Sequence, residues 1–281
     1  MNPEVVVILA GSDSDRPHIG KIAQSLKGAG IPFDVRICSA HKEGSRLQSI
    51  LAEYEGKRVA YFAVAGGTDA LSGTVSFHTG PVLSCPPDHP NPSCMTNPSG
   101  SPNLYFPFPE HAGRATKILF NWEMPASGTD IDPRIAANGG VVIVASQENS
   151  HARTMQKSLD EMTIPYIFAS AKSVDHEFSL TMDTARTYTG APALFVATKG
   201  VAAQALLVSG VPAIYCPPEP CAGFIPTLPK PANIGKLAAQ LFASRNPVYG
   251  QALAIANGDK IARLRAADQK LQAEYAALQG R

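Results

Sequence analysis

Short apolar runs alternate with amphipathic stretches along the first part of the chain. Val5–Ala10, Phe33–Cys38 and Val59–Ala65 have the length of strands, and Pro17–Ala29 and Glu43–Tyr54 carry apolar residues at helical spacing. Strands that are apolar on both faces and alternate with helices are typical of a parallel sheet covered on both sides. The pattern predicts a βαβαβ unit, in which ligands bind beyond the carboxyl ends of the strands.

The rest of the first half continues this pattern less regularly. Pro81–Ser84 is a predicted strand and Glu110–Trp122 a predicted helix. Residues 86–109 between them are rich in Pro, Ser and Asn, so no regular structure is predicted there. A loop of this length is usually functional or part of an interface.

The same order of elements returns about 130 residues later. Val5–Asp15 corresponds to Val141–Ser150, and three shorter matches follow, namely Ile31-Pro32 with Ile164-Pro165, Ser39-Ala40-His41-Lys42 with Ser170-Ala171-Lys172-Ser173, and Cys85-Pro86-Pro87 with Cys216-Pro217-Pro218. The repeat predicts a duplication, with domains at residues 1–124 and 141–281 and a linker at 125–140 that contains Pro and Gly.

Two helices are predicted after the second copy, near Ala232–Ser244 and Val248–Gln279. The last helix carries apolar residues among its charges, at Ile255, Ile261, Leu264, Leu271 and Tyr275. Such a stripe suits packing on a neighbouring subunit or on the helix's own domain, and both interpretations remain open.

Composition argues against several classes of function. The formal net charge is +1 and no run is rich in Lys or Arg, so nucleic acid and membrane surfaces are not expected partners. No apolar run approaches the ~20 residues of a membrane-spanning helix, and a soluble, cytoplasmic protein is expected.

The five cysteines are expected to be reduced. Cys216 and Cys221 as half of a metal site are the less favoured alternative, because no second pair stands at ligand spacing.

Polar residues after the strands differ between the two copies. Four of them in the first copy, Ser12, Ser14, Asp15 and His41, correspond to Gln147, Asn149, Ser150 and Lys172 in the second. The first half is therefore predicted to carry the chemistry and the second half to be scaffold.

The first polar loop, Gly11–Asp15, leads from a strand into a helix. Unpaired backbone N–H groups and the positive end of the helix dipole favour a phosphate or another anion at such a point. Ser12 and Ser14 add hydroxyl donors, and Asp15 can accept from a ribose hydroxyl or an amine. Ser and Asp are also ordinary helix caps, which is the open alternative.

The second polar loop contains the predicted proton carrier. His41 can exchange a proton near neutral pH, and Lys42 can pair with a phosphate or carboxylate. A histidine that only caps the next helix or bonds locally is the alternative.

The third polar loop, Gly66–Gly73, has glycines that allow close approach to a ligand. Thr68, Asp69 and Ser72 can hydrogen-bond to that ligand. Neither a dinucleotide fingerprint nor a Walker motif is present, so NAD and ATP are not suggested.

Taken in order, GSDSD, SAHK, AVAGGTDALSG and SCPP resemble the motifs of the AIR carboxylase family of purine biosynthesis, where AIR is 5-aminoimidazole ribonucleotide. The resemblance covers most of residues 4–122, including Pro98-Ser99-Gly100. It implies two tandem flavodoxin-like three-layer α/β domains with parallel sheets, the second degenerate, and a long C-terminal helix. It also implies a lyase that adds CO2 to AIR, forms 4-carboxy-AIR and needs no cofactor or metal.

The family also contains mutases, which isomerise N-carboxylated AIR to the same product. Lys42, Ala70 and Cys85-Pro86-Pro87 resemble the direct carboxylases instead. Gly67 and Asp69 depart from the direct carboxylases, which usually have Arg and Asn there. The mutase therefore stays an alternative, as does a nucleotide-binding protein that kept the fold without the chemistry.

By resemblance, His41 is the catalytic residue that carries the proton. The implied substrate-binding residues come from the three loops and are Gly11, Ser12, Asp13, Ser14, Asp15, Ser39, Ala40, Lys42, Gly66, Gly67, Thr68, Asp69, Leu71, Ser72 and Gly73. GSDSD and Lys42 would hold the ribose 5-phosphate and its hydroxyls, and the third loop would close over the imidazole. The octamers of the family imply a homotetramer of this two-copy chain.

Overall fold

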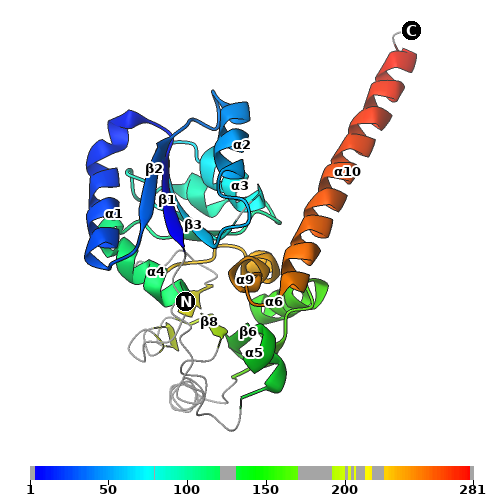
Figure 1. Cartoon of the computed structure of the whole chain (residues 1–281). Coiled ribbons are helices and arrows are strands. Elements are labelled where there is room, and N and C mark those ends of the chain that lie inside the picture. Colours follow the sequence, from blue (N-terminus) through cyan, green and yellow to red (C-terminus); the bar gives the residue numbers. More distant parts are fainter. Residues whose placement is uncertain are drawn as a thin grey trace.

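Two parallel sheets form the framework of the computed structural model, which describes residues 4–78, 80–120, 131–169, 192–199, 202–203, 206, 213–216 and 225–278 (Figure 1). The first sheet has the strand order β2-β1-β3-β4-β5, and the second has the order β7-β6-β8-β9. The predicted α/β fold with parallel sheets is confirmed.

Helices cover both faces of the first sheet. Its strands are β1 (Val5–Ala10), β2 (Phe33–Ile37), β3 (Val59–Val64), β4 (Val82–Ser84) and β5 (Asn103–Tyr105), and its helices are α1 (Arg16–Gly28), α2 (Gly44–Ala52), α3 (Ala70–His78) and α4 (Ala112–Phe120). Because side chains alternate along a strand, Val6 and Ile8 belong to the buried cluster with α1 and α4. Val7 and Leu9 belong to the cluster with α2 and α3, on the other face (Figure 1).

Two elements of the first half differ from the prediction. The stretch 86–109 contains β5 and a 3-10 turn at Pro92–Met95, and a second 3-10 turn, Pro109–His111, begins at its end. The third loop is also shorter than predicted, because α3 begins at Ala70 and includes Leu71, Ser72 and Gly73.

The second sheet repeats the order of the first four strands of the first sheet. Its strands are β6 (Gly140–Val144), β7 (Tyr166–Phe168), β8 (Ala193–Ala197) and β9 (Ala213–Tyr215), and the helices around it include α5 (Pro133–Asn138), α6 (Ser150–Glu161), α9 (Ile234–Phe242) and α10 (Pro247–Leu278). Helix α5 lies inside the predicted linker, where the Asp132 side chain accepts from Arg134 N. The duplication and the domain boundaries stay predictions, and residues 170–173 lie outside the described residues.

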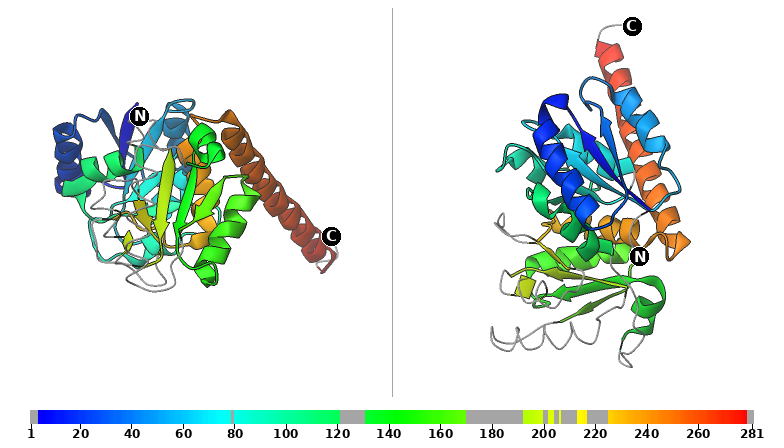
Figure 2. Two further views of the ribbon diagram at one scale, coloured as in Figure 1. Left: turned by 90° about the horizontal axis from the view of Figure 1, so that it is seen from below. Right: turned by 60° about the vertical axis from the view of Figure 1, so that its left-hand side comes forward.

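One short segment joins the two sheets. Tyr105 N in β5 donates to Thr227 O at 2.7 Å, and Thr227 N donates back to Tyr105 O at 3.0 Å. Leu228 N donates to Tyr215 O in β9 at 2.8 Å. A single cluster of buried apolar side chains also contains residues of both sheets, among them Ile8 and Ile143. The halves therefore share a core and a sheet edge. Figure 2 shows the two sheets with their helices lying against each other.

The C-terminal helices pack on both halves before α10 leaves the body of the molecule. Gln240 Nε2 of α9 donates to Ser76 O at 2.8 Å, and Asn257 Nδ2 of α10 donates to Phe77 O at 2.7 Å. Farther along α10, Leu264 is 64% exposed and Leu271 is 53% exposed. The first part of α10 therefore packs within the chain, and its last part projects away (Figures 1 and 2). No helix among the described residues is long and apolar enough to span a membrane.

Candidate active site

The register of the first sheet brings the three polar loops to one edge. Ala10 of β1 pairs with Ile37 of β2 and with Val64 of β3, so the three strands end at one level. Cys38 N donates to Ala10 O at 2.8 Å, and Gly11 N donates to Val64 O at 2.9 Å. Because β1 lies between β2 and β3, its loop stands between the other two loops. We call this carboxyl edge, formed by Gly11–Asp15, Ser39–Lys42 and Gly66–Asp69, the rim.

The first rim loop leaves two backbone N–H groups ahead of α1 open to an anion. Ser12 Oγ accepts from Ser14 N at 3.2 Å and lies 2.8 Å from Ser14 Oγ, so Ser12 caps the 3-10 turn Asp13–Asp15. Asp15 stands at the N-cap of α1 but makes no side-chain cap bond among the described residues. The capping alternative therefore holds for Ser12 and not for Asp15. Arg16 N donates to Asp13 O and Pro17 has no N–H, so the first turn of α1 itself offers few donors. Ser12 N and Asp13 N, which have no acceptor among the described residues, remain able to bind a phosphate.

The matching loop of the second half is closed by its own side chain. Asn149 Oδ1 accepts from His151 N at 2.9 Å and from Ala152 N at 3.2 Å, at the start of α6. Two N–H groups that an anion would need are thereby satisfied. This difference supports a site in the first half and a structural role for its counterpart.

The second rim loop presents His41 and Lys42 to solvent. Glu43 N and Lys42 N donate to Ser39 O at 2.8 and 3.2 Å, which makes a tight turn before α2. Both side chains are exposed and make no hydrogen bond or ion pair with the described part of the chain. The alternative of a capping or locally bonded His41 is not realised here. An unengaged imidazole at the rim is available for proton transfer to a ligand.

The third rim loop is held by the loop that follows β4. Gly67 has φ +65, a left-handed conformation that glycine adopts without a steric penalty. Its N–H donates to Asp88 Oδ2 at 2.7 Å, and its carbonyl accepts from Ser93 Oγ at 2.9 Å. Gly66 and Thr68 stay exposed. Backbone groups and the Thr68 hydroxyl are therefore what this loop offers to a ligand.

The side chain of Asp69 is buried and makes its hydrogen bonds inside the protein. The residue is 6% exposed, and its Oδ1 accepts from Ser72 N at 2.9 Å. Its Oδ2 accepts from Ser72 Oγ at 2.5 Å and from Ser84 Oγ at 3.2 Å. Leu71 and Ser72 are buried, and Gly73 is half-buried in α3. In this conformation Asp69 and Ser72 hold α3, and their contact with substrate stays a prediction.

His18 also lies near the rim, and it is absent from the predicted site. It lies in the first turn of α1, where Nε2 is 3.0 Å from Cys85 O. A carbonyl can only accept, so Nε2 carries the proton and Nδ1 has the lone pair of the neutral ring. Burial lowers the pKa of His18, and nearby Lys21 acts in the same direction. The sequence does contain a signal for His18: it follows Asp15 by three residues and so lies on the same side of the predicted helix.

The rim has no cysteine suited to nucleophilic attack. Cys38, Cys85 and Cys94 are free and buried, and burial raises the pKa of all three thiols. No group of three or more His, Cys, Asp or Glu side chains with metal-binding potential occurs in the described ranges. Cys216 is also free and buried, and Cys221 lies outside those ranges.

The second half holds the segment that supports the third loop. Asn233 Oδ1 accepts from Gly100 N at 2.7 Å, and Asn233 Nδ2 donates to Pro98 O and Ser101 O, each at 3.3 Å. Asn97, next in this segment, donates from Nδ2 to Ser72 Oγ at 3.0 Å. A continuous set of contacts therefore runs from the second half to α3.

Lys236 adds a cation to this contact. Its Nζ donates to Gly100 O at 3.3 Å and to Asn257 Oδ1, and it lies 5.2 Å from the centre of the Phe77 ring. Burial, and secondarily the charge of Lys260, lower the pKa of Lys236 from 10.5 to about 8.

The lowered pKa of Lys236 makes stability depend on pH in a defined direction. Between pH 8 and 10.5 the unfolded chain binds the proton that folded Lys236 has released, so the free energy of unfolding rises with pH. Relative to Lys236→Met, we expect wild-type stability to be level below pH 8 and to increase up to pH 10.5. Urea denaturation at a series of pH values measures this. Lys270→Met, at an exposed lysine of α10, is the control, and parallel curves for wild type and Lys236→Met would contradict the expectation.

Sequence comparison with known proteins finds its matches in the first half of the chain. The family model described as AIR carboxylase matches residues 5–98. Phosphoribosylaminoimidazole carboxylase of Treponema denticola is 45% identical over 86 residues, which are 30% of this chain and 54% of that protein. The human bifunctional phosphoribosylaminoimidazole carboxylase/phosphoribosylaminoimidazole succinocarboxamide synthetase is 43% identical over 89 residues, 31% of this chain and 21% of that protein.

A solved structure gives a match of similar extent. The crystal structure of Treponema denticola PurE is 38% identical, covers 39% of this chain and 75% of that chain, and has a TM-score of 0.37. This chain spans about half the length of the Treponema denticola carboxylase. The matched residues contain all three rim loops. Residues 5–98 of this chain are therefore similar to the AIR carboxylase family.

Proposed function

We propose that this protein carboxylates AIR with CO2 and forms 4-carboxy-AIR. The observation that carries the proposal is the common level at which β1, β2 and β3 end, because it gathers a loop with unbonded N–H groups, an unengaged imidazole and a glycine loop at one rim. The first two groups suit a nucleotide phosphate and a proton transfer. The family of residues 5–98 supports the same reaction.

In the proposed reaction the protein positions AIR and moves one proton. The N–H groups of Ser12 and Asp13, with Ser14 and Lys42, hold the 5-phosphate, and Asp15 accepts from a ribose hydroxyl. The 5-amino group makes the adjacent ring carbon enamine-like, so this carbon forms the new bond to CO2. The tetrahedral intermediate then loses its ring proton to His41, which restores the aromatic ring and leaves the carboxylate.

The second half supports this site in the proposal. Asn233 and Lys236 fix the 98–101 segment, and Asn97 connects that segment to α3 behind the third rim loop. We also propose a homotetramer, in which the exposed part of α10 contacts another chain. The four described cysteines are free thiols, which fits the cytoplasm as the site of action.

Turnover with two alternative substrates tests the proposed reaction. We expect purified protein to convert AIR and CO2 to 4-carboxy-AIR, measured by the absorbance of the product and by incorporation of labelled bicarbonate. N-carboxylated AIR, supplied to an assay without added bicarbonate, is expected to give no faster reaction. Turnover of that isomer alone would favour the mutase, and AIR binding without turnover would favour a protein without the chemistry.

A further inference from the structure

The strand order of the first sheet locates the crevice in which a ligand of the rim would lie. The order β2-β1-β3-β4-β5 reverses direction between β1 and β3, and ligands of such sheets bind beyond the strand ends at this point. Gly11 N donates to Val64 O at 2.9 Å, so the first and third rim loops begin next to each other. A nucleotide with its phosphate on the first loop would therefore direct its base towards the third loop.

Asp88, in the loop after β4, places a carboxylate beside the third rim loop. Its Oδ2 accepts from Gly67 N at 2.7 Å, and its Oδ1 accepts from Asn91 Nδ2 at 2.9 Å. A Cβ placed on Gly66 would lie 3.6 Å from Asp88 Oδ1, so the carboxylate stands directly against this loop. The residue is exposed. The carboxylate is therefore part of the surface that the rim presents to a ligand.

The Asp88 carboxylate has acceptor capacity left for that ligand. A carboxylate offers about four lone-pair sites, and the hydrogen bonds from Gly67 N and Asn91 Nδ2 use two of them. Within the described ranges Asp88 forms no ion pair. Burial raises the pKa of Asp88, but the two hydrogen bonds outweigh it and leave the pKa below its ordinary value. The group is therefore an anion without a countercharge at neutral pH.

Opposite charges flank the first rim loop. Lys42 is exposed on the second loop, and Asp88 adjoins the third, so the first loop stands between them. Ser12 N and Asp13 N of the first loop have no acceptor among the described residues. The rim thus offers donors and a cation to an anionic group, and on the other side an anion to a hydrogen-bond donor. A phosphate alone would use only one of these sides.

AIR carries groups that match both sides. It has a phosphate at one end and an amino group on its imidazole ring at the other. In the proposed reaction this amino group donates electron density into the ring as the ring carbon bonds to CO2, so its nitrogen gains positive charge until His41 takes the ring proton. A carboxylate that is fixed beside this nitrogen stabilises the developing charge.

From these features we infer that Asp88 determines specificity at the rim by accepting a hydrogen bond from the 5-amino group of AIR, so that the site selects amino-substituted imidazole ribonucleotides. The inference rests on the proposed binding of AIR at the rim. It adds a residue from the loop after β4 to the three loops that form the site.

Titration calorimetry with two ligands tests the inference. AIR and imidazole ribonucleotide differ only in the 5-amino group. We expect the wild type to bind AIR at least about tenfold more tightly, because only AIR makes the charge-assisted hydrogen bond. In Asp88→Ala the preference should fall to within about threefold, since no acceptor is left there. A displaced third loop would weaken both ligands alike and would keep the ratio of their affinities.

Ser93→Ala is the control for loop position. Ser93 Oγ donates to Gly67 O at 2.9 Å and accepts from Asp69 N at 2.9 Å, so its removal loosens the third loop and leaves the Asp88 carboxylate in the chain. Both ligands should then lose affinity by a similar factor. Loss of the preference for AIR in Ser93→Ala as large as in Asp88→Ala would overturn the inference.

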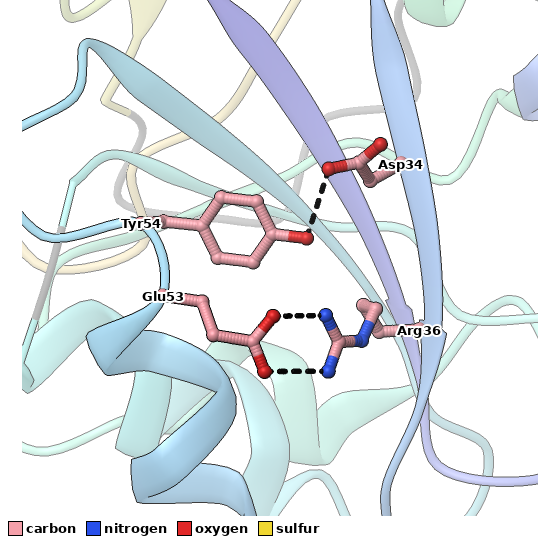
Figure 3. A network of polar contacts seen from close by, with 4 residues as sticks. All are labelled: Asp34, Arg36, Glu53 and Tyr54. Carbon is pink, nitrogen blue, oxygen red and sulfur yellow. Dashed lines mark hydrogen bonds and ion pairs between the residues drawn. The ribbon is translucent and has the colours of Figure 1, made fainter.

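Asp34→Asn is the control for the loss of an exposed carboxylate. Asp34 accepts from the Tyr54 hydroxyl at 3.0 Å, next to the ion pair of Arg36 with Glu53 that also joins β2 to the end of α2 (Figure 3). It lies three residues before the end of β2, which is ~10 Å along the strand from the rim. Both affinities should therefore stay unchanged.

The outcomes separate this inference from the proposed reaction. Asp88→Asn, which keeps the shape but not the charge, replaces Asp88→Ala should that variant fail to fold by circular dichroism, with the preference reduced at least about threefold. Equal affinity of the wild type for the two ligands, or an unchanged preference in the folded Asp88 variant, would overturn the inference even where AIR is carboxylated. Absence of AIR binding would overturn both. A preference lost with Asp88 in a protein without carboxylation would support the inference and contradict the reaction.

Discussion

Replacing His41 with Asn is expected to lower kcat for AIR carboxylation by about 10²- to 10⁴-fold, the usual contribution of a positioned acid or base. His41 is exposed at the rim and engages no described side chain or backbone group, so its removal costs the fold little. Asn cannot take up the ring proton near neutral pH. The phosphate contacts of the first loop do not involve His41, so AIR affinity is expected to stay within a few-fold, measured by titration calorimetry alongside kcat.

The matched control is His151→Asn in α6 of the second half. The structural role of His151 that we identify is its backbone N–H, which donates to Asn149 Oδ1 and which the variant keeps. Carboxylation should therefore be unchanged. If His41→Asn kept wild-type kcat, proton transfer would have to be assigned to another group, and His18 would be the first to examine because its Nδ1 is an acceptor near the same edge.

Replacing Asp69 with Ala is expected to destabilise the protein by about 3–7 kcal/mol. The carboxylate accepts from Ser72 N, Ser72 Oγ and Ser84 Oγ in a buried setting, and Ala leaves all three donors without this acceptor. A lost helix cap costs about 1 kcal/mol, and each buried donor without a partner adds about 1–3 kcal/mol. The free energy of unfolding from urea denaturation measures the loss.

The variant Asp69→Asn separates the hydrogen bonds from the charge. Asn keeps Oδ1 as acceptor for Ser72 N, and the hydroxyls of Ser72 and Ser84 can rotate to accept from the new amide. We expect it to lose less than half as much stability as Asp69→Ala. Asp259→Ala on the exposed face of α10 is the surface control, expected within about 0.5 kcal/mol of wild type. Equal stability of Asp69→Ala and wild type would show that the network contributes nothing.

Local patterns of the sequence were sufficient to predict much of the fold. The strand predicted at Val5–Ala10 is β1, and the helix predicted at Val248–Gln279 is α10 to within one residue at each end. Both follow from an apolar run or from helical periodicity that needs no distant partner. The same holds for the parallel arrangement, because strands that alternate with helices have few other ways to pack.

Features that depend on distant contacts were missed. β5 is three residues long and is recognisable through its pairing with β4 and Thr227. α3 begins where Asp69 accepts from Ser72 N, and the sequence predicted that Asp69 would bind substrate instead. At the site, the rim follows from the order of motifs, whereas His18 and Asn233 gain their positions through Cys85 O and Gly100 N. Tertiary contacts of this kind leave no periodic signal.

The pairing of Thr227 with Tyr105 bears on why the chain retains a half to which we assign no chemistry. Without that half, β5 would present free backbone donors and acceptors, which is a template for intermolecular association. The shared apolar cluster would be cut open at the same time. The chain is therefore expected to unfold as one cooperative unit, with the second half shielding an edge and a core surface of the first.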